Sequence, residues 1–446
     1  MTGILLCSTI IGNAQRQAGA QQQVLEKIAA DQFLRETERY ERALKLAAQK
    51  GWSLSFKDDK GNTARLVGVD DKGFPMYVGT QSNLVAATTI GTSKLWSGGS
   101  SGLNLNGSNI LLLNKLGIWD GGQINQTHVE FNNRITQKDN AVGVDPHATH
   151  VAGTLIASGV NPTAKGMANG IRGIWAYDFS NHLAEMAVAS PSLLVSNHSY
   201  GSISGWRYNQ SQSRWEFWGA PGAIEDWKFG AYTNEAALWD SIAYFAPNYL
   251  IVKSSGNNRN EKGPTLGTTY WRQNESSQWI NAGARGADIS DQSEFDLLPT
   301  YSTAKNALIV GNVALVPGGY TRPEDVLLAS SSSVGPTDDG RIKPDVVAPG
   351  SGITSTSTGS NSSYATLSGT SMSSPTVAGS AILLQELFMS KFNNRSAWSS
   401  TIKGLIIHTA DKASTVPGPN YLHGWGLANI AKAAEVLNNT TNNLVT

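Results

Sequence analysis

The sequence predicts an α/β fold, in which a mainly parallel sheet lies between layers of helices and a small α+β unit precedes it. From residue 110 onward, short apolar runs alternate with longer segments whose apolar residues recur at helical spacing. This βαβ rhythm is typical of a parallel sheet that helices cover on both faces. The chain has 446 residues, 40% of them hydrophobic, so it can bury a core of the size that this fold needs.

The first part of the chain differs from the rest in charge and periodicity. Residues 1–15 hold a short apolar run and then small residues, as a secretory signal does, which predicts export to the medium, the periplasm or the cell surface. The alternative is the apolar N-terminus of a cytosolic protein. A helix-plus-meander unit is expected over 16–80, with a helix at 16–50 and strands at 52–56, 64–69 and 74–78.

A large domain is expected over residues 81–437. Its predicted strands are 110–119, 171–177, 193–197, 249–253, 307–313 and 346–347. Its predicted helices are 83–96, 147–158, 180–189, 234–245, 375–391 and 398–410. The aromatic-rich stretch 202–230 interrupts this rhythm; it either lines substrate subsites or buries a long loop. The Asn/Thr-rich residues 438–446 predict a tail or linker.

Composition excludes several classes of function. The formal net charge is zero and no long basic run is present, so no nucleic-acid partner is expected. No apolar segment is long enough to span a membrane. Cys7 is the single cysteine, which rules out an intrachain disulfide and a thiolate metal site. We expect a monomer.

Ser371 is the candidate nucleophile. It lies in Gly369-Thr-Ser-Met-Ser-Ser-Pro375, and the proline is expected in the first turn of a helix. Ser371 would then sit at a helix N-terminus, where free N–H groups and the helix dipole stabilise negative charge on a substrate oxygen. The alternative is a serine that only caps the helix.

A serine nucleophile needs a base, and the base needs a group that orients it. His147 lies at the expected start of an apolar helix, whereas His150 is one turn further in and is expected to be structural. Asp120 ends an apolar strand in front of two glycines and is the candidate orienting carboxylate. Asn257 follows another strand and could donate to an oxyanion, with Asn258 as the second choice.

Four segments together resemble the subtilisin-like serine peptidases (subtilases), most closely the secreted enzymes of Bacteroidetes-type bacteria. They are, in this order, Asp120-Gly-Gly, His147-Ala-Thr-His-Val-Ala-Gly-Thr154, Ser255-Gly-Asn257 and Gly369-Thr-Ser-Met-Ser-Ser-Pro375. The resemblance covers about residues 83–437. It implies the three-layer subtilisin-like fold and endopeptidase activity through an acyl-enzyme.

The resemblance also implies a role for each matching residue. Asp120, His147 and Ser371 would form the catalytic triad, and Asn257 would complete the oxyanion hole. Two walls would bind substrate, one made of Ser199, Tyr200 and Gly201 and the other of Ser254, Ser255 and Gly256.

Protein or peptide substrates follow from the same resemblance. Residues 16–80 would be a prosegment that inhibits the enzyme intramolecularly, enters the groove at 74–80 and is cut between Val78 and Asn83. The alternative is a permanent N-terminal domain. No cofactor is needed for the chemistry, and structural calcium is compatible with the many loop aspartates. Three departures from the family pattern, namely Gly121, Ala148 and the loop that carries Phe131-Asn-Asn-Arg134 and Asp139, allow no calcium ligand to be assigned, so the metal ligands are unknown.

Three other functions stay open. They are a catalytically silent subtilase-like binding or scaffold protein, a subtilase that joins peptides, and an esterase of the α/β-hydrolase type. The order Asp120, His147, Ser371 and the missing second glycine of a G-x-S-x-G elbow argue against the esterase.

Overall fold

The computed structural model describes most of the chain. The described residues are 23–24, 26–27, 30–31, 34–57, 63–69, 73–80, 86–259, 261–291, 294–316 and 318–440. The expected signal-like segment 1–15 and most of the expected tail 438–446 lie outside them.

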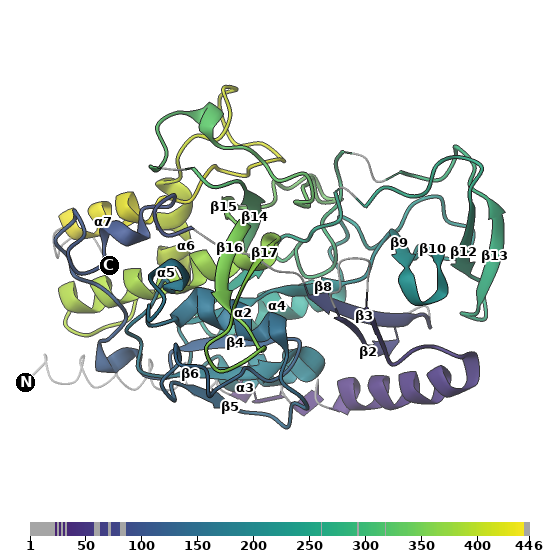
Figure 1. The fold of residues 1–446 in the computed structure, drawn as a ribbon, viewed down its shortest axis with the longest axis horizontal. Coiled ribbons are helices and arrows are strands. Elements are labelled where there is room, and N and C mark those ends of the chain that lie inside the picture. Colours follow the sequence, from purple (N-terminus) through teal and green to yellow (C-terminus); the bar gives the residue numbers. More distant parts are fainter. Residues whose placement is uncertain are drawn as a thin grey trace, which may run out of the picture.

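A seven-stranded, all-parallel sheet forms the centre of the molecule, as the sequence predicts (Figure 1). Its strands, from one edge to the other, are β15 (Val346–Pro349), β14 (Leu308–Val313), β11 (Leu250–Ser254), β7 (Val195–His198), β4 (Leu116–Asp120), β6 (Ile174–Asp178) and β5 (Ile135–Gln137). Strands β4, β7, β11, β14 and β15 are buried along their whole length, because both faces of the sheet are covered.

Helices cover both faces of this sheet and give it two hydrophobic layers. The larger layer takes its side chains from α2 (Pro146–Ile156), α5 (Thr370–Lys391), α6 (Ser399–His408) and α7 (Ile430–Asn439). The second layer lies under α3 (His182–Ala189) and α4 (Asn234–Phe245). Helix α5 is buried almost throughout and packs on α2, β7, β11 and β14. The fold class is therefore the predicted α/β class.

Three predicted boundaries differ most from the structure. Residues 87–91 form turns followed by the 3-10 helix η1 (Thr92–Lys94), because Gly91 adopts a left-handed conformation that ends a helix. The strand predicted at 110–119 begins only at Leu116; before it lie η2 (Ile110–Leu112) and Asn114, which is also left-handed. Helix α5 begins at Thr370, so Pro375 lies inside the helix.

The N-terminal unit has the predicted order of elements. Residues 34–50 are helical and are followed by β1 (Ser55–Lys57), β2 (Thr63–Val69) and β3 (Pro75–Thr80). These strands form an antiparallel sheet, which β8 (Tyr200–Ser202) of the large domain extends as a fourth strand. A small core of this unit also contains Ile203. The two parts of the chain are thus joined by a shared sheet as well as by packing.

The aromatic-rich stretch forms part of a separate sheet, on the right of Figure 1. Its strands are β13 (Trp279–Ala284), β12 (Thr269–Gln273), β10 (Arg214–Phe217) and β9 (Trp206–Asn209). Trp206 and Phe217 are fully buried in a small core between these strands, while Trp218 stacks on Phe56 of the N-terminal unit. Most of these rings therefore serve packing, one of the two alternatives left open by the sequence.

The remaining elements are short. A hairpin of β16 (Ser351–Thr356) and β17 (Tyr364–Ser368) packs on α2 and leads directly into α5. Further 3-10 turns are η3 (Pro162–Ala164), η4 (Phe179–Asn181), η5 (Gln210–Gln212) and η6 (Pro323–Asp325). Among the described residues, no helix combines the length and apolarity needed to cross a membrane.

Candidate active site

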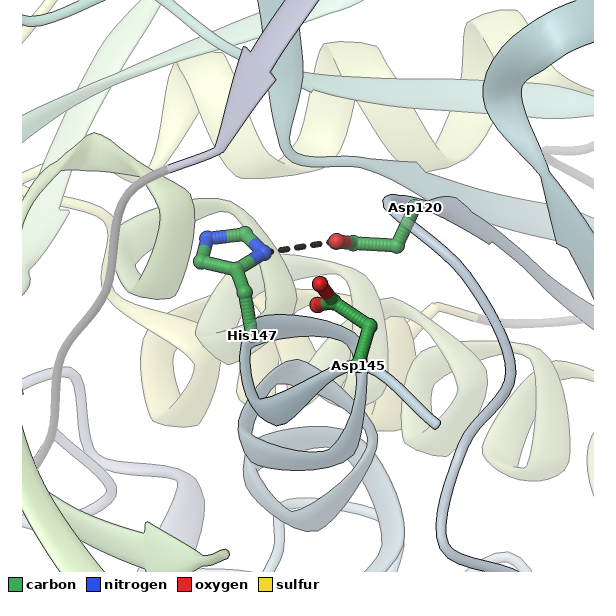
Figure 2. A group of neighbouring side chains, drawn as sticks. All are labelled: Asp120, Asp145 and His147. Carbon is green, nitrogen blue, oxygen red and sulfur yellow. Dashed lines mark hydrogen bonds and ion pairs between the residues drawn. The ribbon is translucent and has the colours of Figure 1, made fainter. Parts of the chain in front are cut away.

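Asp120 and His147 meet at the carboxyl edge of the central sheet (Figure 2). Asp120 ends β4, and His147 lies in the first turn of α2, after Pro146 at the start of the helix. The His147 Nδ1 atom lies 2.6 Å from Asp120 Oδ1, and both side chains are buried. The carboxylate also accepts a hydrogen bond from the Gly121 N–H at 2.7 Å. The imidazole is therefore held in one orientation by the aspartate that the sequence predicted for this task.

Asp145, a residue that sequence reasoning did not assign to this site, lies beside the pair (Figure 2). It caps α2 by accepting a hydrogen bond from the Ala148 N–H at 2.8 Å. Burial raises the pKa of Asp120, His147 lowers it, and the Asp145 carboxylate raises it further. The net shift is upward, and Asp120 Oδ2 is buried without a hydrogen-bond partner in the described part of the chain.

Ser371 lies in the first turn of α5, as predicted, and a hydrogen bond from outside the helix holds its backbone in place. Because Pro375 has no N–H, the Ser371 carbonyl lacks the hydrogen bond that a helix would normally supply. The Ser199 hydroxyl supplies it instead, at 2.7 Å. Ser199 in turn accepts a hydrogen bond from Asn197 at 3.0 Å. Proline inside the helix and serine on the neighbouring segment thus compensate for each other.

The Ser371 hydroxyl donates to the Ser199 carbonyl at 3.2 Å. No hydrogen bond joins it to His147 in the described part of the structure. Hydrogen bonds between catalytic groups often form fully only when substrate binds. The structure therefore brings Asp120 and His147 together, and holds Ser371 against the Ser199 segment.

Asn257 is bound to the same helix start. Its Oδ1 accepts a hydrogen bond from the Thr370 N–H at 2.9 Å, so its amide nitrogen is left to act as a donor. The N–H of Ser371 lies in the first helical turn, where an intrahelical partner is absent. Asn258 is engaged elsewhere, with its N–H on Ser333 and its amide on Ser204. Of the two asparagines, Asn257 is therefore the one placed to bind an oxyanion.

A small cavity opens beside Ser371. Its lining includes Ser199, Tyr200 and Gly201 from one predicted wall, Ser254 and Gly256 from the other, and the candidate oxyanion donor Asn257. Ser255, which the resemblance also assigned to a wall, is not part of this lining, because its hydroxyl turns away to the Ser333 carbonyl. Sequence reasoning missed Lys253 and Pro299, which also line the cavity.

The acidic and histidine side chains near this site do not form a convincing metal site. Asp120, Asp145 and His147 are the one described group close enough to hold an ion. Two of them are already joined by a short hydrogen bond, and the third caps a helix. His150 is a structural residue, as expected: it is buried, bonds the Ala365 carbonyl, and burial lowers its pKa to about 3. Structural calcium elsewhere stays a prediction.

The fold and this set of side chains are those of a serine hydrolase built on a parallel α/β sheet. The family model of the subtilase family matches residues 64–426, so the chain belongs to this family of serine peptidases. The match includes every residue assigned above to the site.

Curated relatives agree with this family. The chain is 25% identical, over 391 residues, to the serine protease/ABC transporter B family protein tagB of Dictyostelium discoideum; the match covers 68% of this chain and 19% of that protein. It is 51% identical over 65 residues to the C5a peptidase of Streptococcus pyogenes, covering 15% of this chain and 5% of that protein. The chain thus spans about a fifth or less of the length of these relatives.

Solved structures support the fold. The CspB protease of Clostridium perfringens has a TM-score of 0.55 at 17% identity, covering 79% of this chain and 97% of that one. The Prenylagaramide maturation protease PagA has a TM-score of 0.51 at 17% identity, covering 78% and 98%.

Proposed function

We propose that the protein is an exported serine endopeptidase that hydrolyses peptide bonds and is made as a self-processed precursor. The 2.6 Å contact between His147 Nδ1 and Asp120 Oδ1 carries this proposal. Because Nδ1 faces the aspartate, Nε2 is the ring nitrogen that can take a proton from a nucleophile.

The chemistry follows from these positions. Ser371 Oγ attacks the scissile carbonyl, His147 takes its proton, and the proton then passes to the leaving amine. Asp120 orients the imidazole and stabilises its charged form. The negative oxygen of the tetrahedral intermediate is bound by the Ser371 N–H and the Asn257 amide, and water then hydrolyses the acyl-enzyme.

The pairing of β3 with β8 supports a peptide as the substrate. Val78, Gly79 and Thr80 pair in antiparallel register with Ser202, Gly201 and Tyr200. The backbone of this edge therefore accepts an extended strand, and Tyr200 follows directly on Ser199, which contacts Ser371. A peptide that binds along this edge can continue past the nucleophile, as an endopeptidase requires.

The same pairing supports residues 16–80 as an intramolecular inhibitor. While β3 occupies β8, a substrate strand cannot bind that edge. We expect cleavage between Val78 and Asn83, within or just beyond the paired residues, and export before or during this step. The rest of the predicted cleavage interval, residues 81–83, lies outside the described residues.

A timed incubation tests the proposal. Wild type, Ser371→Ala and His147→Ala are incubated alone and with a peptide pool, and mass spectrometry reads both self-cleavage and new peptide ends. Ser373→Ala serves as the control, because Ser373 lies in the same helical turn but bonds Asn312. We expect cuts from wild type and the control only. Cutting by Ser371→Ala at the wild-type rate would refute the assignment, and ligated peptides in place of cut ones would indicate a joining enzyme.

A further inference from the structure

A buried lysine without an acidic partner among the described residues lines the same cavity as the candidate nucleophile. Lys253 is in β11, and its side chain is completely buried. Its ammonium donates to the Ser254 carbonyl at 2.6 Å and to the Ser254 hydroxyl at 3.0 Å. Among the described residues, no carboxylate forms an ion pair with it.

A second buried lysine in the same chain shows the usual arrangement. Lys343 is also almost fully buried, but its ammonium lies 2.6 Å from an oxygen of Asp345. Burial of a charge without an opposite charge is strongly unfavourable. A buried charged side chain therefore ordinarily has an ionic partner or binds a ligand. Burial lowers the pKa of Lys253 to about 7, and that of Lys343, which has its partner, only to about 8.

The position of Lys253 indicates what its charge could bind. Lys253 lines the cavity beside Ser371, and both atoms that its ammonium contacts belong to Ser254, which forms a wall of that cavity. Among the described residues that line the cavity none is acidic, and Arg207, the other cation there, is paired with Glu261 at 2.6 Å. The charge of Lys253 is therefore the one in the cavity wall that lacks an opposite charge.

The cavity is placed to receive the side chain just before the scissile bond. One wall is the Ser199–Gly201 segment, along which the substrate backbone is proposed to pair, and the cavity reaches Ser371 itself. An ammonium has three N–H groups, and the contacts to Ser254 use two of them. The third can donate to an oxygen on a bound side chain.

We propose that Lys253 makes the enzyme prefer substrates with a glutamate or aspartate immediately before the cleaved bond. This inference rests on the proposed peptidase function. The carboxylate of the substrate supplies the opposite charge that the buried ammonium lacks, in a site from which water is largely excluded. With a neutral side chain in the cavity, the lysine either stays charged without a partner or loses its proton, and in neither case does it bind the substrate as an ion pair.

The test compares peptides that differ only in the residue before the cleaved bond: glutamate, glutamine or leucine. We expect kcat/KM of wild type to be about 10- to 100-fold higher for glutamate than for glutamine, since a hydrogen bond to a charged group contributes a free energy of that size. In Lys253→Met, which keeps the length of the side chain without its charge, the two rates should become similar.

Two further variants make the outcome decisive. Lys115→Met removes a lysine at the opposite end of β4 from Asp120, where the ammonium bonds the Ser192 carbonyl, and should keep the preference. Thermal unfolding of Lys253→Met, which loses an unpaired buried charge, should show that it folds at least as stably as wild type. Equal cleavage of all peptides by wild type, or an unchanged preference in Lys253→Met, would overturn the inference and leave the peptidase function standing. No Ser371-dependent cleavage of any peptide would instead overturn the proposed function.

Discussion

At the start of α5 the Ser199 hydroxyl replaces the N–H that Pro375 lacks as the hydrogen-bond donor to the Ser371 carbonyl. This arrangement predicts that the effects of mutating Ser199 and Pro375 on stability are coupled. Ser199→Ala removes the hydroxyl that bonds the Ser371 carbonyl at 2.7 Å and that accepts from Asn197 at 3.0 Å. Both groups are buried, and each unsatisfied buried group costs about 1–3 kcal/mol. We expect Ser199→Ala to lower the free energy of unfolding by about 2–4 kcal/mol.

Pro375→Ala should reduce this loss. Alanine at position 375 has an N–H, which can bond the Ser371 carbonyl within the helix when Ser199 cannot. The cost of Ser199→Ala should then fall by about 1 kcal/mol or more, which is the interaction free energy of a double-mutant cycle.

The assay is urea unfolding followed by tryptophan fluorescence, with every variant made in a Ser371→Ala background to prevent self-digestion. That background keeps the Ser371 carbonyl, which is the group under test. Ser373→Ala is the matched control: its hydroxyl lies in the same turn but bonds Asn312, so its cost should not depend on residue 375. If Ser199→Ala costs the same with proline and with alanine at 375, the explanation of the proline is wrong.

Three further predictions concern acidic side chains. Burial raises the pKa of Glu36 from its ordinary value of 4.5 to about 8, so docking of the N-terminal unit should weaken as the pH rises from about 4.5 to about 8. The hydrogen-exchange protection factors of residues 34–50, which remove the intrinsic pH dependence of exchange, should fall over this range in wild type but not in Glu36→Gln. Burial raises the pKa of Glu130, but several hydrogen bonds outweigh burial, and the net shift of the pKa is downward. The Glu130 carboxylate therefore stabilises the fold above its unfolded pKa and stabilises it less in acid. Glu130→Gln should lower the free energy of unfolding in urea by about 2–4 kcal/mol at pH 7, and an unchanged midpoint would contradict this. Asp145→Asn keeps a helix cap but removes a negative charge that raises the pKa of Asp120. The acid limb of the plot of kcat/KM against pH should therefore move to lower pH. A shift to higher pH would contradict the role assigned to Asp145.

Much of the fold could be predicted because its strands are continuous apolar runs. A strand such as Leu250–Ser254 is buried on both faces, so every residue in it must be apolar or must find a special partner, and the run is visible in the sequence. The start of α5 could not be placed in the same way. Proline normally marks a first helical turn, and only the tertiary contact from Ser199 allows Pro375 to lie deeper in the helix.

The residues of the site likewise differ in how well the sequence predicts them. Asp120, His147, Asn257 and Ser371 occur in local patterns of strand ends and helix starts, so the sequence could indicate them. Asp145 resembles an ordinary helix cap, and its effect on Asp120 depends on a distance that no local pattern encodes.

The role of a single buried acid is even harder to predict from the sequence. Glu130 accepts hydrogen bonds from the Ser158 hydroxyl, from the backbone of residues 159–161 and from Tyr364, so its partners come from two separate parts of the chain. The residues next to Glu130 in the sequence do not indicate these partners. Only the folded structure shows that Glu130 binds the loop of residues 158–161.

The strand β3, which completes a sheet with β8, also has a consequence for the timing of the activation by self-cleavage that we propose. While it is covalently attached, its effective concentration at β8 is about millimolar or higher, so peptides at micromolar concentration compete poorly. Once the bond beyond it is cut, that advantage is lost and the strand competes as a separate molecule. Dilution then favours its departure. A precursor crowded at its site of synthesis would therefore stay inhibited longer than the same molecule after it has spread into a larger volume.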